Sequence, residues 1–97
     1  MIVRFIEPAL TELHEAVNYY DYQLPGLGLR IFHEVNVSIK KITDMPEAWT
    51  KIGENTRRCL LKGFPYALLY IIDPQVILIT AVANLHRDPE HFRNRTF

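Results

Sequence analysis

The side chains with the most reactive chemistry gather near the end of the chain. His86 and Arg87 are neighbours, and His91 follows a few residues later. An imidazole can act as a general acid or base near neutral pH, and a guanidinium can stabilise charge that develops on a phosphate. The sequence shows no serine–histidine–aspartate arrangement and no positioned nucleophile beside them. A structural or partner-binding role is therefore favoured over catalysis.

An adjacent pair of arginines, Arg57 and Arg58, precedes two strongly apolar segments. Adjacent side chains of a strand point to opposite faces, so the two guanidinium groups cannot serve the same surface. A solvated strand is one interpretation of the pair. The other is contact with a phosphate or a partner's carboxylate, which the planar guanidinium binds through two parallel hydrogen bonds.

A metal or cofactor site is not indicated. His86, Asp88 and His91 offer ligand atoms, but the spacing of the histidines does not suit one helical face, and no cysteine lies nearby. The four glycines are scattered along the chain and form no phosphate-binding loop. We expect neither a metal nor a cofactor.

The composition is that of one globular domain, residues 1–97. Hydrophobic residues make up 48% of the chain, enough for a core, and 11 basic residues balance 11 acidic ones. This balance argues against a non-specific nucleic-acid binder. Residues 1–50 nevertheless carry a net charge of −3 and residues 51–97 a net charge of +3. The second half can therefore present a local positive field.

The expected compartment is the cytoplasm. The single cysteine, Cys59, excludes an internal disulfide and is typical of a reducing setting. The first apolar stretch is too short for a cleavable signal, and no apolar run approaches the ~20 residues of a membrane-spanning helix. We expect no membrane contact.

The first half of the chain predicts a strand followed by two helices. Residues 2–6 are β-branched and aromatic, as in a short strand. Apolar residues at helical spacing predict a helix over 8–23 and a second periodic stretch over 31–42, which ends before Pro46. The turn at 25–28 is short, so we expect the helices to lie antiparallel.

The second half predicts a meander of three strands, over about 56–61, 66–72 and 76–83. A loop at 46–55 precedes them, and Pro89 opens a last helical turn. The last two strands are apolar on both faces, so we expect the helices to cover one face and another segment to cover the other. The predicted fold class is α+β in the order β-α-α-β-β-β, with an antiparallel or mixed sheet of about four strands.

Several short motifs occur together in the order typical of one family. They are Ala9, Glu12-Leu13, Glu15-Ala16 and Tyr19-Tyr20; Pro25 to Gly28 and Phe32; Arg57-Arg58, Leu60, Phe64 to Tyr66, Leu68 and Tyr70; Ala81 to Ala83, His86 to Pro89, Phe92 and Arg95. Each piece is weak alone, but the set spans nearly the whole chain. On these residues the sequence resembles the RelE/ParE superfamily of toxins from type II toxin–antitoxin modules, most closely its ParE-like branch of plasmid stabilization proteins.

The resemblance implies a small curved antiparallel sheet with an N-terminal helical hairpin packed on one face, and one of two activities. RelE-like members are ribonucleases that cut messenger RNA on the ribosome, with a C-terminal tyrosine or histidine. Characterised ParE-like members inhibit DNA gyrase without a recognised catalytic site. Phe92 stands where an aromatic residue is expected, and no tyrosine follows Tyr70. Because a phenyl ring has no proton to transfer, the resemblance favours a gyrase inhibitor over an enzyme.

The resemblance also implies partners and site residues. Contact with the target would fall on six residues of the second half: Arg57, Arg58, His86, Arg87, Arg93 and Arg95. In a ribonuclease, the catalytic candidates among them would be Arg57, His86 and Arg87. A cognate ParD-like antitoxin would fold its disordered tail onto the toxin in a hetero-oligomer, and the covered surface would include Tyr19, Tyr22 and Phe32.

Three functions stay open on the sequence. The chain can be a protein-binding poison of DNA gyrase, a ribosome-dependent mRNA endoribonuclease, or a degenerate module member that binds an antitoxin but is no longer toxic. The neutral net charge, which is low for a protein of this kind, is the reason for the third.

Overall fold

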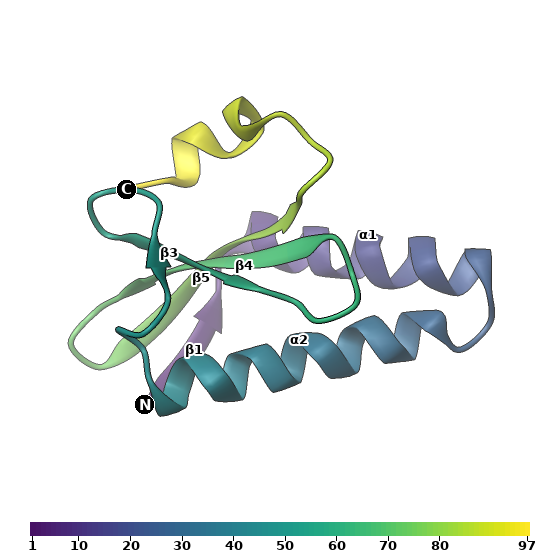
Figure 1. Ribbon diagram of the computed structural model, residues 1–97, viewed down its shortest axis with the longest axis horizontal. Helices are drawn as coiled ribbons and strands as arrows, with labels where there is room; N and C mark the ends of the chain where they lie inside the picture. The colour runs from purple at the N-terminus through teal and green to yellow at the C-terminus, as the bar shows by residue number, and fades with distance from the viewer.

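The computed structural model describes residues 1–97 and arranges them in three layers (Figure 1). A helical hairpin lies on one side of a five-stranded sheet, and a C-terminal segment lies on the other. The elements, in chain order, are β1 (Ile2–Phe5), α1 (Glu7–Gln23), α2 (Leu27–Asp44), β2 (Thr50–Lys51), β3 (Thr56–Leu60), β4 (Tyr66–Ile72), β5 (Val76–Asn84) and the 3-10 helix η1 (Pro89–Arg95). The predicted α+β class is confirmed.

The helical hairpin forms because each helix has one apolar face. The residues buried on these faces are Ala9, Leu13 and Ala16 of α1, and Ile31, Val35 and Ile42 of α2. Gly26, whose φ is 98°, supplies the left-handed turn into α2, and its N–H donates to Asp21 Oδ1 over 2.9 Å. The short turn leaves the helices side by side, as predicted (Figure 1).

The strands lie in the order β1-β5-β4-β3-β2. β3, β4 and β5 form the predicted antiparallel meander, but β1 runs parallel to β5, so the sheet is mixed rather than purely antiparallel. Parallel neighbours need a long connection, and here it includes both helices and three strands. The additional strand β2 pairs Thr50 with Arg58 inside the segment predicted as a loop. A strand of two residues is too short for any alternation of residue types to reveal it.

A bulge in β5 shapes the two faces of the sheet. Tyr70 pairs with Ile79 and Leu69 pairs with Ala81, so Thr80 has no partner in β4. The cluster on the helical side includes Leu68, Tyr70, Ile77, Ile79 and Val82, whereas the smaller second cluster consists of Leu69, Ala81, Ala83 and Phe92. Phe92 belongs to η1, so the C-terminal segment covers the second face of the central strands. The expected additional covering segment is confirmed.

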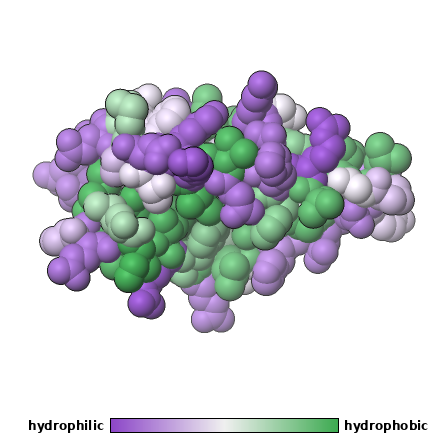
Figure 2. Space-filling view, turned by 90° about the horizontal axis from the view of Figure 1, so that it is seen from below, coloured by the Kyte–Doolittle hydropathy of each residue, from purple (hydrophilic) through white to green (hydrophobic).

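The underside of the molecule is mixed in character (Figure 2). Its apolar side chains gather mainly on the left, at the end where β1 begins and α2 finishes in Figure 1. The exposed apolar residues of those two element ends are Met1, Ile2 and Met45. None of the helices combines the length and the apolar character that a membrane crossing requires.

Candidate functional site

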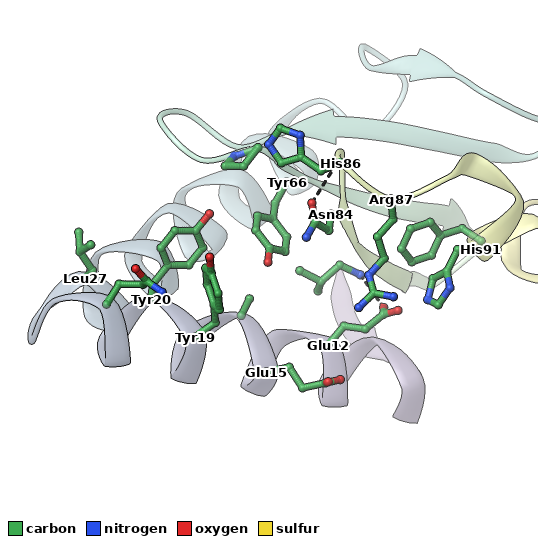
Figure 3. A pocket seen from close by; sticks show the side chains of 15 residues that line it. Glu12, Glu15, Tyr19, Tyr20, Leu27, Tyr66, Asn84, His86, Arg87 and His91 are labelled. Carbon is green, nitrogen blue, oxygen red and sulfur yellow. Dashed lines mark hydrogen bonds between the residues drawn. The ribbon is translucent and has the colours of Figure 1, made fainter.

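An open groove of about 700 Å³ lies between α1 and the segment that follows β5 (Figure 3). Three tyrosines line it: Tyr19, Tyr20 and Tyr66. The Tyr20 ring packs edge-on against Phe64 at 5.0 Å and against Tyr66 at 6.0 Å between ring centroids. Edge-to-face contacts of this kind fix the ring positions, so the groove has one firm aromatic wall.

The Tyr20 and Tyr66 phenols of this wall stay protonated at neutral pH, because the pKa of each is raised. Burial is the main cause that raises the pKa of Tyr66, the neighbouring Tyr20, Tyr19 and Glu15 raise it further, and Arg87 opposes them. Burial also raises the pKa of Tyr20. Both hydroxyl groups can therefore donate a hydrogen bond to a ligand, but neither can serve as a base.

The remaining walls carry opposite charges. α1 contributes Glu12 and Glu15, and the C-terminal segment contributes His86, Arg87 and His91. In Figure 3 the Arg87 side chain points from its loop towards α1, and it forms no ion pair. A groove with an acidic and a basic wall favours a partner whose charges are arranged in the complementary order.

The backbone holds His86 and Arg87 in place. Asn84 Oδ1 accepts a hydrogen bond from the His86 N–H over 2.9 Å, and the Asn84 carbonyl accepts from the Arg87 N–H over 3.0 Å. The Leu85 N–H donates to the Pro65 carbonyl over 2.8 Å. These contacts tie the loop to the end of the sheet, so the imidazole and guanidinium groups start from a fixed backbone.

A second cleft, of about 450 Å³, shares Arg87 and Phe92 with the groove and lies against η1. Arg58 and Arg93 also line it. Arg93 pairs with Glu90 at 3.1 Å, and both side chains are largely exposed, so this ion pair is weak. Arg58 and Arg87 have no such partner. The structure thus brings three of the predicted target contacts together and leaves two of them without a neutralising carboxylate.

Arg57 lies on the opposite face of β3, because its cross-strand neighbour is Tyr70 whereas that of Arg58 is Leu69. Its Nη1 donates to the carbonyls of Glu47 and Trp49 over 2.9 and 2.8 Å. Arg57 therefore fixes the loop that follows α2. The predicted pair separates into an engaged Arg57 and a free Arg58.

Arg95 is engaged as well. It forms an ion pair with Glu12, with 2.5 Å between Nη2 and Oε2, and both side chains are 16% exposed. Its guanidinium carbon also lies 5.1 Å from the centre of the Phe92 ring. Among the predicted cations, Arg57 and Arg95 thus make internal contacts, while Arg58 and Arg87 line open clefts.

The three residues expected to meet an antitoxin are all exposed. Tyr22 of α1 is 90% exposed, Phe32 of α2 is 45% exposed, and Tyr19 lines the groove. Leu24 and Leu29, which flank the hairpin turn, are exposed too. The end of the helical hairpin therefore carries several apolar side chains that the chain itself does not cover.

Sequence reasoning missed several groove residues. Glu12 meets Val82 across 70 positions of the chain, so no local spacing indicates their contact. Tyr66 belongs to an apolar strand and resembles a core residue, and the sequence around His91 suggests no role beyond that of a metal ligand. Asn84 did carry a signal, because in turns an asparagine side chain often accepts a hydrogen bond from the backbone N–H two residues later. The structure contains no group of three or more His, Cys, Asp or Glu side chains that could hold a metal ion.

Known proteins help at the level of the fold. No protein-family model and no curated protein matches the chain. The fold is similar to a solved structure described as "Chromosomal ParDE TA system from P. aeruginosa", with a TM-score of 0.77 and 14% sequence identity. The likeness covers 89% of this chain and 97% of the other. The chain therefore has a ParE/RelE-like α+β fold.

Proposed function

We propose that this chain is the toxin component of a type II toxin–antitoxin module of the ParE-like kind. The observation that carries the proposal is the fold likeness to a ParDE system over nearly the whole of both chains. The family motifs in the sequence support it independently. A cognate ParD-like antitoxin holds the protein inactive in a hetero-oligomer in the cytoplasm.

The proposed target is DNA gyrase, which the protein inhibits by binding. Arg58 and Arg87 support this choice, because they line one cleft beside η1 and have no carboxylate partner. His86 and Arg93 extend the basic surface. A protein surface with unpaired guanidinium groups suits carboxylates of a macromolecule, and arginine is enriched among residues that dominate binding.

The antitoxin is proposed to cover Tyr22 and Phe32 at the end of the helical hairpin and Tyr19 in the groove. These side chains are exposed although they are large and apolar. Large apolar side chains that stay exposed in a monomer mark surfaces for a partner.

The test begins with expression in bacteria, with and without a second reading frame for the antitoxin. The frame to look for is a neighbouring one that encodes a small DNA-binding protein with a disordered tail. We expect growth arrest with this chain alone and normal growth with both. The purified chain should then inhibit supercoiling by gyrase at micromolar concentration. Unchanged growth without the second frame contradicts a toxin, whereas growth arrest with intact supercoiling contradicts only the gyrase target.

A second candidate function is an mRNA endoribonuclease, and the groove favours it. His86, His91 and Arg87 line the same groove as the protonated Tyr66, so groups able to move protons and to bind phosphate share one cavity. Under this alternative, induction of the chain fragments cellular mRNA, and His86→Ala abolishes the cleavage. Intact mRNA in arrested cells excludes it.

A further inference from the structure

The free edge of β5 is the starting point. β1 pairs with β5 only from Val76 to Ile79, although β5 continues to Asn84. Beyond Ile79, the backbone groups of β5 on this side have no neighbouring strand. Strand edges that lie partly buried need another source of hydrogen bonds.

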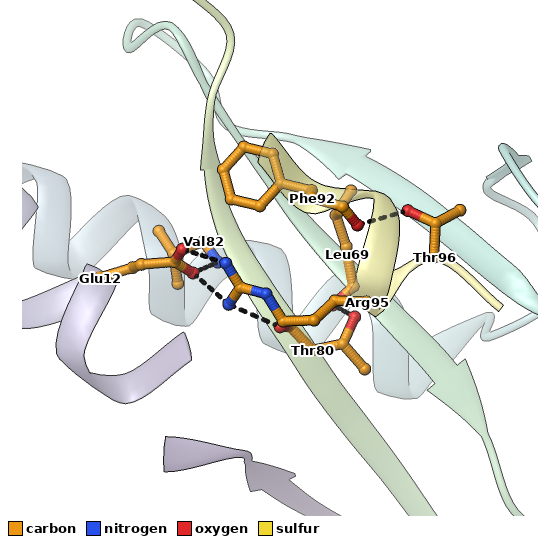
Figure 4. A network of polar contacts seen from close by, with 7 residues as sticks. All are labelled: Glu12, Leu69, Thr80, Val82, Phe92, Arg95 and Thr96. Carbon is orange, nitrogen blue, oxygen red and sulfur yellow. Dashed lines mark hydrogen bonds and ion pairs between the residues drawn. The ribbon is translucent and has the colours of Figure 1, made fainter. Parts of the chain in front are cut away.

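Two side chains supply those bonds (Figure 4). Glu12 Oε1 accepts from the Val82 N–H over 3.0 Å, and Arg95 Nη1 donates to the Thr80 carbonyl over 3.1 Å. The two side chains are also joined to each other, with Arg95 Nη1 and Nη2 donating to Glu12 Oε1 and Oε2 over 3.0 and 2.5 Å. The pair thus takes the place of the missing strand.

The same pair connects three parts of the fold. Glu12 comes from α1, Arg95 from η1, and their shared hydrogen bonds end on β5. Both side chains are 16% exposed, so loss of either one leaves a poorly solvated charge without a partner. The other ion pair of η1, between Arg93 and Glu90, is exposed and connects the helix only to itself.

The rest of the C-terminal segment is attached mainly at its two ends. The Leu85 N–H donates to the Pro65 carbonyl over 2.8 Å, and the Phe97 carbonyl accepts from the Asn55 N–H over 2.6 Å. The Phe97 N–H also donates to Thr56 Oγ1 over 2.7 Å. Between these ends, η1 is held by the packing of Phe92 on Leu69, Ala81 and Ala83 and by the contact of Arg95 with α1.

We propose that Glu12 and Arg95 form a latch that fixes η1, within the C-terminal segment (residues 85–97), on the sheet, and that Glu12 is a positioning residue for His91. Opening the latch lifts η1 from β4 and β5 and moves His91 away from the groove. Glu12 acts through Arg95 and need not touch any partner. The consequence for toxicity rests on the proposed function, whereas the latch itself does not.

The test uses nuclear magnetic resonance of the whole chain with labelled alanine methyl groups. Ala81 and Ala83 lie under the Phe92 ring, so their methyl shifts report whether η1 is seated. For Glu12→Ala we expect both shifts to move towards those of a ring-free environment. We also expect the amides of Val82 and η1 to exchange at least about tenfold faster, as in a local opening. Amides of α2 should keep their rates.

The matched control is Glu90→Gln, which breaks the exposed ion pair of the same segment and should change neither readout. Arg95→Met removes the other partner of the ion pair and must reproduce the effect of Glu12→Ala. If both latch variants behave like the control, the proposal is wrong. If both unfold the whole chain, the pair is a general stabilising contact and the proposal is again wrong.

Growth arrest gives a separate readout. Glu12→Ala should weaken the arrest while binding to the antitoxin through the helical hairpin persists. If the unmodified chain causes no arrest, the proposed function fails, but the methyl shifts and exchange rates still decide whether the latch exists.

Discussion

Arg57 and Arg58 show how far neighbouring residues of one type can differ. Their opposite orientation follows from the alternation of side chains in a strand, and the sequence predicts it. The loop after α2 lies on the face of β3 that carries Arg57. The choice of that face depends on the position of the helices and on the register of β3 with Tyr70 and Leu69 in β4. No spacing in the chain contains that information, so sequence alone could not identify the engaged arginine.

Replacement of each arginine by alanine should separate the two roles. Arg57→Ala removes two hydrogen bonds to the carbonyls of Glu47 and Trp49, so the free energy of unfolding should fall by about 2 kcal/mol. Arg58→Ala removes no internal bond and should leave stability within about 0.5 kcal/mol. It should nevertheless raise the inducer concentration needed for growth arrest by about tenfold, as for an arginine at the centre of an interface.

Urea denaturation and growth curves on the two variants check this assignment. The same loss of stability in both variants would contradict the difference in their contacts. Full toxicity of Arg58→Ala would remove Arg58 from the target surface.

At the scale of elements, the sequence predicts what depends on periodicity. Both helices and the three strands of the meander follow from apolar residues spaced for their faces. The bulge at Thr80 and the strand β2 do not follow, because one extra residue and two paired residues leave no repeating pattern. The bulge has a real effect, since it decides which alanines of β5 lie under Phe92.

The contact between the two helices depends on Gly28. A Cβ atom at this position would lie 2.6 Å from the Val17 carbonyl oxygen and 2.8 Å from Asp21 Cβ, so the helices would have to separate. Helix propensity alone predicts that Gly28→Ala stabilises the protein by about 1 kcal/mol. We expect the opposite sign, a loss of about 2 kcal/mol from overpacking.

Thermal or urea unfolding measures the sign directly. Leu29→Ala is the matched control, because it changes the next residue of the same helix where the side chain is 73% exposed. A stabilised Gly28→Ala variant would show that the helices do not approach this closely.

At the scale of the whole molecule, the groove and the latch bring together residues from opposite ends of the chain. The sequence shows the types of these residues and predicts some of them as site residues. Their proximity comes from packing α1 and the C-terminal segment against the same end of the sheet, which is a tertiary property. For this reason the cations could be found by type, whereas Glu12 and Tyr66 could not.

Global stability should depend on pH through Tyr70. Its hydroxyl donates to the Pro46 carbonyl over 2.5 Å, and burial raises its pKa to about 12, partly opposed by Arg57. The unfolded chain releases this proton near pH 10, so the stabilisation is complete below pH 10 and is lost as the pH rises towards 12. The loss should be about 1.4 kcal/mol per pH unit in that window.

Urea denaturation of Tyr70→Phe from about pH 8 to about pH 11 tests this dependence, because the range spans the ordinary pKa of tyrosine. This variant should be less stable at pH 8, because it lacks the hydrogen bond, but its stability should fall less steeply above pH 10. Tyr22→Phe, at an exposed position, should behave like the unmodified protein. Equal slopes in all three proteins would show that Tyr70 does not control the alkaline transition.

The parallel pairing of β1 with β5 has a consequence for the order of synthesis. Ile2 is synthesised well before Val76, its partner in the sheet. The first strand must therefore remain unpaired until most of the chain has emerged, and contacts of such long sequence separation form slowly. A polypeptide released before Val76 cannot close this sheet, so interrupted translation yields no finished copy of the fold.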